Sequence, residues 1–190
     1  MDSYNIMIVG VGGQGTLLAS RLAGAVAIRS GYDVKVSEVH GMSQRGGSVV
    51  TYVRFGEKVY SPLITKGGAD IILAFELLEA ARWLPYLKPG GKLIVNTQQM
   101  DPMPVVIGSA EYPQGLKEAL AERCGEVELM DALSLAVDSG TAKAVNVVLI
   151  GAMARHLPFA REDWQAAIQD IVPEKFRSVN LTAFDKGYGV

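Results

Sequence analysis

The feature that most constrains the fold is a glycine-rich turn between an apolar run and a helical pattern. Residues 4–9 read YNIMIV, which has the length and composition of a buried strand. Residues 10–15 read GVGGQG, and residues 16–30 carry apolar side chains on one helical face before Gly31 ends the pattern. Residues 33–39 alternate as a second strand. A strand–helix–strand crossover of this kind is normally parallel and right-handed, which predicts an α/β fold.

The same patterns continue to the end of the chain. Further strands are expected at residues 48–55, 58–61, 70–75, 92–96, 105–107 and 127–130. Helices are expected at residues 76–87, 115–123, 133–137, 141–156, 161–171 and 174–186. A turn at Gly56 and Glu57 would join the first two of these strands in a hairpin, and residues 88–91 (KPGG) predict another turn. The expected fold class is α/β: one doubly wound, Rossmann-like domain over residues 1–190, with a mostly parallel sheet, an antiparallel hairpin and a helical C-terminal third.

Composition and charge exclude several classes of function. Hydrophobic residues make up 49% and charged residues 20% of the chain, as in a compact soluble protein. The net charge is −2 and no block of Lys or Arg stands out, so neither nucleic acid nor a membrane is expected as a partner. One cysteine, Cys124, and two distant histidines provide no metal-ligand set, so no metal site is expected. The early first strand and the short apolar helical pattern at residues 142–153 predict a cytoplasmic protein.

The glycine turn matches G-x-G-x-x-G after a strand and at the start of a helix, which is the context that this motif requires. Backbone N–H groups in such a turn approach an anion, with help from the helix dipole. The candidate cofactor-binding residues here are Gly10, Gly12, Gly13, Gln14 and Gly15, and the Gln14 side chain is expected to point at the ligand. Glu38 follows roughly 20 residues later, where a ribose-binding acid would lie. The alternative is that the glycines only let the helix pack tightly on the strand.

Residues 39–50 (VHGMSQRGGSVV) form a second unusual segment between two expected strands, too polar for a core. Arg45 is a candidate to bind a carboxylate or phosphate bidentately. Gly46 and Gly47 would let the backbone approach the same anion, and we count them as cofactor-binding candidates. The alternative for Arg45 is a surface arginine braced on a loop carbonyl.

Other polar side chains of this segment are also candidates. His40 is a candidate to donate to a substrate carbonyl or to transfer a proton, and a structural hydrogen bond that holds the loop is the alternative. Ser43 and Gln44 are candidates to hydrogen-bond a ligand or a partner. No second histidine and no evident base lies near Ser43 in the sequence, which argues against a serine hydrolase.

Three polar residues outside these segments are further substrate or interface candidates. Glu76 follows an expected buried strand, at the end of the sheet where α/β proteins bind ligands, although a charge that complements the helix N-terminus is the favoured interpretation. Asn146 lies in a helix that is apolar nearly all round, and a buried amide must be hydrogen-bonded. Asn180 shares a helical stripe with Phe176 and Phe184. Either amide would bond a loop carbonyl or reach a partner subunit, and the structural role is favoured.

Taken together, several segments resemble one family. These are GVGGQG (residues 10–15), SEVHGMSQRGGSV (37–49), YSPLI (60–64), ADIILAFELLEAAR (69–82) and NVVLIGA (146–152). The chain is similar over nearly its whole length to the gamma-type domain of 2-oxoacid:ferredoxin oxidoreductases. His-Gly-Met-Ser-Gln before Arg-Gly-Gly resembles the indolepyruvate branch, the beta subunit in particular.

The resemblance implies a subunit of an enzyme that decarboxylates a 2-oxoacid on thiamine diphosphate with Mg²⁺. Two electrons pass through iron–sulfur clusters to ferredoxin, and coenzyme A takes the acyl group. This chain shows no cluster ligands and no Mg²⁺-diphosphate signature, so these cofactors are expected on a larger alpha subunit. Two other functions stay open: a self-contained NAD(P)-dependent oxidoreductase, and a non-catalytic assembly module whose glycine loop binds only protein.

Overall fold

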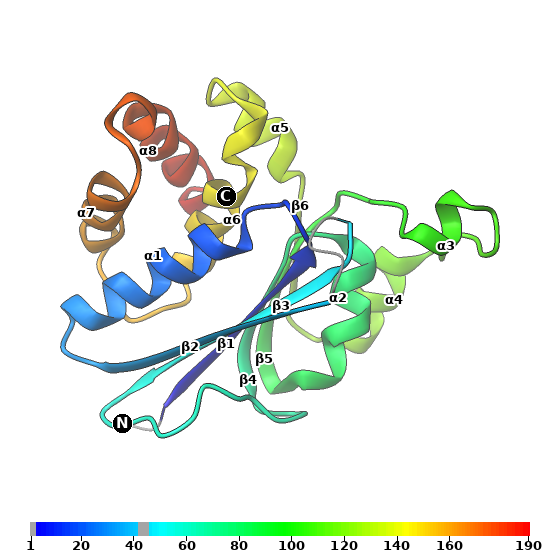
Figure 1. Ribbon diagram of the computed structural model, residues 1–190, viewed down its shortest axis with the longest axis horizontal. Coiled ribbons are helices and arrows are strands. Elements are labelled where there is room, and N and C mark those ends of the chain that lie inside the picture. Colours follow the sequence, from blue (N-terminus) through cyan, green and yellow to red (C-terminus); the bar gives the residue numbers. More distant parts are fainter. Residues whose placement is uncertain (1–2, 42–45) are drawn as a thin grey trace.

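The computed structural model describes residues 3–41 and 46–190. Within them, six strands form one sheet in the order β2-β3-β1-β4-β5-β6 (Figure 1). The strands are β1 (Tyr4–Val11), β2 (Asp33–His40), β3 (Ser48–Gly56), β4 (Ala69–Ala74), β5 (Leu87–Asn96) and β6 (Val127–Met130). β3 runs antiparallel to both of its neighbours, and the other pairs are parallel. The expected fold class, a mostly parallel α/β sheet with an antiparallel element, is confirmed.

The antiparallel hairpin is built from other strands than the sequence predicts. β3 pairs with β2 from Asp33 opposite Gly56 to His40 opposite Val49, and its other edge pairs with β1. Both edges of β3 are therefore occupied, and residues 58–61 form no strand. The unusual segment after His40 is thus the connection of the hairpin. β2 runs in the direction of β1, as the crossover predicts, but with β3 between them.

Helices cover both faces of the sheet (Figure 1). One face carries α1 (Thr16–Arg29), α5 (Ala132–Asp138), η2 (Ala142–Ala144), α6 (Val145–Ala154), α7 (Arg161–Ile171) and α8 (Glu174–Tyr188). The opposite face carries α2 (Leu77–Trp83), η1 (Leu84–Tyr86) and α4 (Leu116–Arg123). The short helix α3 (Met103–Val106) projects from the body.

Strand alternation produces a hydrophobic core on each face of the sheet. Ile6 and Ile8 of β1 lie in the larger core, with α1 and the C-terminal helices, while Met7 and Val9 pack on the side of α2 and α4. In the larger core, α6 and α8 approach so closely that a Cβ on Gly151 or Gly187 would meet the backbone of the other helix. This crossing holds α8 against α6, which in turn contacts β4 and β5, while α7 packs on α1.

Two local expectations are wrong. Residues 105–107 were expected as a strand, but the chain forms α3, in which Pro104 lies in the first turn, where its missing N–H costs nothing. Residues 88–91 lie within β5 rather than in a turn before it. The pairing of β4 with β5 is irregular between Ala69 and Ile71, and Gly90 takes a positive φ of 75° in that bulge. Along the described part of the chain, no helix has the length and hydropathy to cross a membrane.

Candidate functional site

The candidate site lies where β1 ends and α1 begins, at the carboxyl end of the parallel strands, the usual place for ligands in such sheets. Gly13 and Gly15 have φ values of 104° and 88°, which side chains rarely adopt. A Cβ on Gly15 would also lie 2.5 Å from Nδ2 of Asn146. These two positions therefore require glycine for the turn itself, whatever the turn binds.

Gln14 does not point at a ligand as the sequence suggests. Its Oε1 accepts from the N–H of Val11 at 2.7 Å, and its Nε2 donates to the carbonyl of Phe75 at 3.0 Å. The side chain thus fastens the turn to the ends of β1 and β4. Gly10 is buried in β1 and lies against this side chain, since a Cβ there would meet Oε1 of Gln14 at 2.8 Å. Both residues shape the turn instead of lining the cavity beside it.

The hairpin connection is joined to the glycine turn. The N–H of Gly12 donates to the carbonyl of Gly47 at 2.8 Å, and the N–H of Gly46 donates to the carbonyl of Gly12 at 3.3 Å. Gly46 has a positive φ of 75°, and in that conformation it donates one bond of this reciprocal pair of hydrogen bonds. The two glycine segments picked out in the sequence therefore form one structure. Ser43, Gln44 and Arg45 lie outside the described residues.

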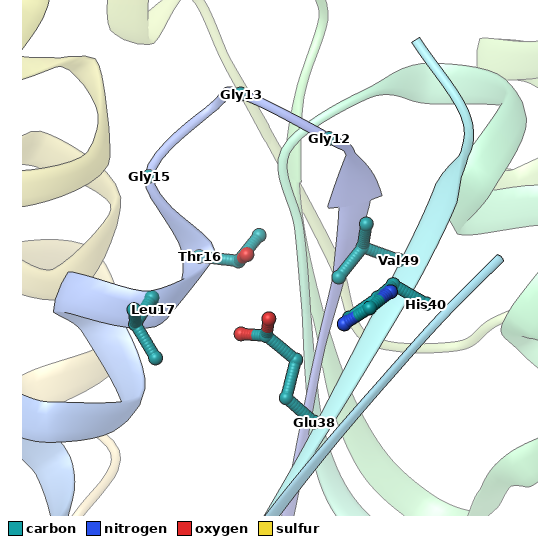
Figure 2. A pocket seen from close by; sticks show the side chains of 8 residues that line it. All are labelled: Gly12, Gly13, Gly15, Thr16, Leu17, Glu38, His40 and Val49. Carbon is teal, nitrogen blue, oxygen red and sulfur yellow. The ribbon is translucent and has the colours of Figure 1, made fainter. Parts of the chain in front are cut away.

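A cavity of about 370 Å³ opens between the turn and the end of β2 (Figure 2). It is lined by Gly12, Gly13, Gly15, Thr16, Leu17, Glu38, His40 and Val49. The Glu38 carboxylate is directed toward Thr16, and the His40 ring lies beside it on β2. Nδ1 of His40 is 3.1 Å from the carbonyl of Gly41, and no described residue forms a hydrogen bond with its Nε2.

The two sides of this cavity have opposite chemistry. Among the described residues, no acceptor is found for the N–H groups of Gly13 and Gly15, and these lie just before the positive end of the α1 dipole. This side suits an anion. Glu38 faces it with a carboxylate, which accepts hydrogen bonds from hydroxyl or amide groups and repels a phosphate. Because β3 separates β1 from β2, Glu38 lies about 5 Å further from the glycine turn than it would if β2 were directly beside β1.

A second cavity of about 220 Å³ lies on the α2 side of the same loop. The lining includes Gly46, Gly47, Glu76 and Glu79, together with Arg82 and residues in and just before α3. The hairpin loop therefore separates two hollows, one on each face of the sheet.

Glu76 is in this second hollow and not in the cavity of Gly12 and Gly13. Only 1% of it is exposed, and it is the N-cap of α2, accepting from the N–H of Glu79 at 2.8 Å. It also accepts from the N–H of Met100 at 3.2 Å and from the hydroxyl of Tyr112. Burial, followed by this carboxylate, raises the pKa of Tyr112 well above its usual range. The structure thus supports the interpretation of Glu76 that the sequence favours, a role at the N-terminus of a helix.

The two asparagines differ in their bonds but line one cavity. Asn146 is buried; its Oδ1 accepts from the N–H of Val147 at 2.9 Å, and its Nδ2 is 3.5 Å from the carbonyl of Gly15. The expected bond to a loop carbonyl is thus to the glycine turn itself. Asn180 instead donates to the carbonyl of Phe176 within its own helix at 2.8 Å. Both side chains line a larger cavity between α1 and α8.

Some residues of the site were not candidates from the sequence. Thr16, Leu17 and Val49 line the first cavity, and the signal for Thr16 was its place directly after the glycine motif. Tyr112 bonds a carboxylate 36 positions earlier, and nothing near it in the sequence indicates this. Over residues 3–41 and 46–190, no group of three His, Cys, Asp or Glu side chains is placed to hold a metal ion.

Comparison with known proteins supports the resemblance over the whole chain. The family model described as pyruvate ferredoxin/flavodoxin oxidoreductase matches residues 5–190. Indolepyruvate oxidoreductase subunit IorB from Thermococcus kodakarensis is 46% identical over 98% of this chain and 95% of its own length.

Two solved structures have the same fold. The gamma subunit of a keto/oxoacid ferredoxin oxidoreductase from Geobacter sulfurreducens has a TM-score of 0.72 and 25% identity, over 98% of this chain and 96% of that chain. The 2-oxoglutarate:ferredoxin oxidoreductase from Magnetococcus marinus has a TM-score of 0.73 at 20% identity, over 100% of this chain and 31% of that chain. The chain therefore belongs to the pyruvate ferredoxin/flavodoxin oxidoreductase family, and within it to the group of 2-oxoacid oxidoreductase subunits.

Proposed function

We propose that this chain is the small subunit of an indolepyruvate:ferredoxin oxidoreductase and that its glycine-turn cavity forms one wall of the coenzyme A site. The observation that carries the proposal is the reciprocal bonding of Gly12 with Gly46 and Gly47, which holds two glycine segments at one cavity. This cavity combines backbone N–H groups, which suit a phosphate oxygen, with Glu38 and His40, which suit hydroxyl and amide groups. Coenzyme A carries both kinds of group.

The substrate and co-substrate are supported by the relatives. The Thermococcus kodakarensis protein at 46% identity is named for indolepyruvate. The Magnetococcus marinus structure, in which a chain containing this fold was solved with 2-oxoglutarate, coenzyme A and succinyl-CoA, supports coenzyme A as acyl acceptor. The overall reaction would convert a 2-oxoacid, coenzyme A and two oxidised ferredoxins into an acyl-CoA, carbon dioxide, two reduced ferredoxins and a proton.

The decarboxylation and the electron transfer are assigned to a larger partner subunit. The chain has one cysteine, Cys124, which is buried, so its residues do not fit an iron–sulfur cluster. Thiamine diphosphate, Mg²⁺ and the clusters would then lie on the partner, which also passes electrons to ferredoxin. This chain would bind and orient coenzyme A and exclude water from the junction.

Co-expression with the partner tests the subunit assignment. The chain, carrying an affinity tag, is co-expressed with the large subunit, and reduction of methyl viologen is followed with indolepyruvate and coenzyme A. We expect dye reduction from the complex and none from either subunit alone. Turnover by the lone chain would contradict the proposal.

The site assignment is tested in the same complex. Glu38→Gln and His40→Ala should each raise KM for coenzyme A by about tenfold, the equivalent of 1.4 kcal/mol, while KM for indolepyruvate changes little. Glu122→Gln, on the exposed surface of α4, is the matched control. An unchanged KM for coenzyme A in both site variants would refute this site, even if the complex is active.

A dinucleotide is the second candidate ligand, because Glu38 lines the same cavity as Gly12 and Gly13. Titration of the isolated chain with NADH, followed by nicotinamide fluorescence, separates the two. Saturable binding that Glu38→Gln abolishes would favour the dinucleotide, and no binding at millimolar NADH would remove it.

A further inference from the structure

A cavity of about 620 Å³ lies in the helical layer, apart from the glycine-turn cavity. The two are separated by the first turn of α1, where Leu17 lines one and Leu18 lines the other. The larger cavity is enclosed by α1, by the segment from Gly140 to Asn146, by the link between α7 and α8, and by the first half of α8. Its volume is in the range of small-molecule sites.

Its apolar lining comes from α1, the end of α7, the link between α7 and α8, and α8 itself. The residues are Leu18, Ile171, Val172, Pro173, Phe176 and Val179. Phe176 is 48% exposed, an unusual state for a large aromatic side chain at a concave surface. An apolar or aromatic ligand body packed here would remove that ring from water.

The polar groups of the same cavity are all neutral or positive. Arg21 and Lys143 line it, and no acidic side chain of residues 3–41 and 46–190 does. Neither cation has an ion pair or a hydrogen bond with any described residue, whereas Arg29, Arg155 and Arg161 all pair with carboxylates. Asn146 and Asn180 add two amides. The cavity therefore combines an apolar wall with two cations that lack an anion.

We propose that this cavity binds a small amphipathic anion that has an aromatic body and one carboxylate. The aromatic body would pack against Phe176 and Val172. The carboxylate would bind the guanidinium of Arg21 bidentately, with Lys143 as the second cation. The inference does not depend on the proposed function, because neither Arg21 nor Lys143 lines the glycine-turn cavity.

Fluorescence of 8-anilinonaphthalene-1-sulfonate, an aromatic anion whose sulfonate stands in for the carboxylate, tests the site on the full chain. We expect saturable binding, and a dissociation constant at least tenfold higher for the double variant Arg21→Gln, Lys143→Gln. The matched control is Lys117→Gln, Arg123→Gln, which removes the same charge from α4 on the opposite face. The four residues are exposed, so circular dichroism and melting temperature should stay unchanged in both variants.

Competition identifies the ligand class. Indole-3-acetate should displace the dye at a lower concentration than neutral indole does, and inorganic phosphate should not displace it. Phe176→Ala should weaken binding of both the dye and its neutral analogue N-phenyl-1-naphthylamine. Equal dye affinity in the wild-type chain and the Arg21, Lys143 variant would overturn the proposal. So would an equal loss in the α4 control, or displacement by phosphate but not by indole-3-acetate.

Discussion

Gly15 and Asn146 meet at the contact that joins the glycine turn to the C-terminal helices. Gly15→Ala would force a side chain into a φ of 88° and bring its Cβ to 2.5 Å from Nδ2 of Asn146. We expect the free energy of unfolding to fall by about 2–4 kcal/mol, from left-handed strain and overpacking together. Urea denaturation of the full chain measures it.

Gly13→Ala is the control for this contact. Gly13 has a φ of 104°, but no atom of the described residues lies within 4 Å of its added Cβ, so only strain of about 1–2 kcal/mol is expected. Adding Asn146→Ala to Gly15→Ala should recover part of the loss, because it removes the clashing amide. An equal fall in the free energy of unfolding for Gly15→Ala and Gly13→Ala would show that the contact with Asn146 does not contribute.

Tyr112 makes the free energy of unfolding depend on pH in the alkaline range. Burial, and then its bond to Glu76, raises the pKa of Tyr112 in the folded chain, whereas the unfolded chain releases that proton near pH 10, roughly the ordinary value. The folded state thus holds the proton longer. The stabilisation by Tyr112 is complete below about pH 10 and is lost as pH rises further.

Tyr112→Phe therefore gives a pH-dependent difference. At pH 8 the variant should be about 1–3 kcal/mol less stable, because Glu76 loses a donor and the N–H of Leu78 loses its acceptor. Urea curves at pH 8 and pH 10.5 should show this gap narrowing at the higher pH. Tyr60→Phe is the control, since Tyr60 is 89% exposed. A gap that widens with pH would contradict the assigned direction of the pKa.

At the scale of elements, the crossing of α6 and α8 depends on two glycines. A Cβ on Gly187 would fall on the carbonyl of Val148, and backbone cannot move aside as a flexible side chain can. Gly187→Ala should cost about 3 kcal/mol or more, the upper range for overpacking, and lower the melting temperature. Gly125→Ala, with open space around its Cβ, should change stability little. A neutral Gly187→Ala would mean that α8 can shift away from α6.

Elements whose signal is local were predictable from the sequence. α7 has the bounds that its periodicity predicts, and β6 likewise, because each pattern is complete within its own segment. The hairpin was assigned to the wrong partner because strand pairing is a tertiary choice. Gly56 does end β3, but both edges of β3 are already taken by β1 and β2. Val105 and Val106 are β-branched, yet Pro104 sets a helical turn at the surface.

At the scale of the whole molecule, the candidate site was predictable in its location but less so in its orientations. A glycine turn after β1 and a polar segment after β2 both lie at strand carboxyl ends, and the fold brings them together. The direction of Gln14 depends on the carbonyl of Phe75, 61 positions away, and the surroundings of Glu76 depend on Tyr112. No local pattern contains such contacts.

The glycine turn also predicts which face of the molecule meets a partner. The N–H groups of Gly13 and Gly15 have no acceptor among the described residues, so their amide hydrogens should exchange rapidly in the isolated chain. If the carboxyl end of the sheet forms the junction, complex formation with the large subunit should slow exchange in a peptide covering residues 10–18. A peptide covering residues 57–68, in the loop after β3, should not change.

Hydrogen–deuterium exchange with mass spectrometry measures both peptides in one experiment, with serum albumin in place of the large subunit as the control. Protection of residues 57–68 without protection of residues 10–18 would move the junction away from the turn, and the turn would then be explained by packing alone. Protection of residues 10–18 by the large subunit, increased further by coenzyme A, is the result that a shared site requires. Protection by the subunit without any effect of coenzyme A would leave the turn as an assembly contact that binds only protein.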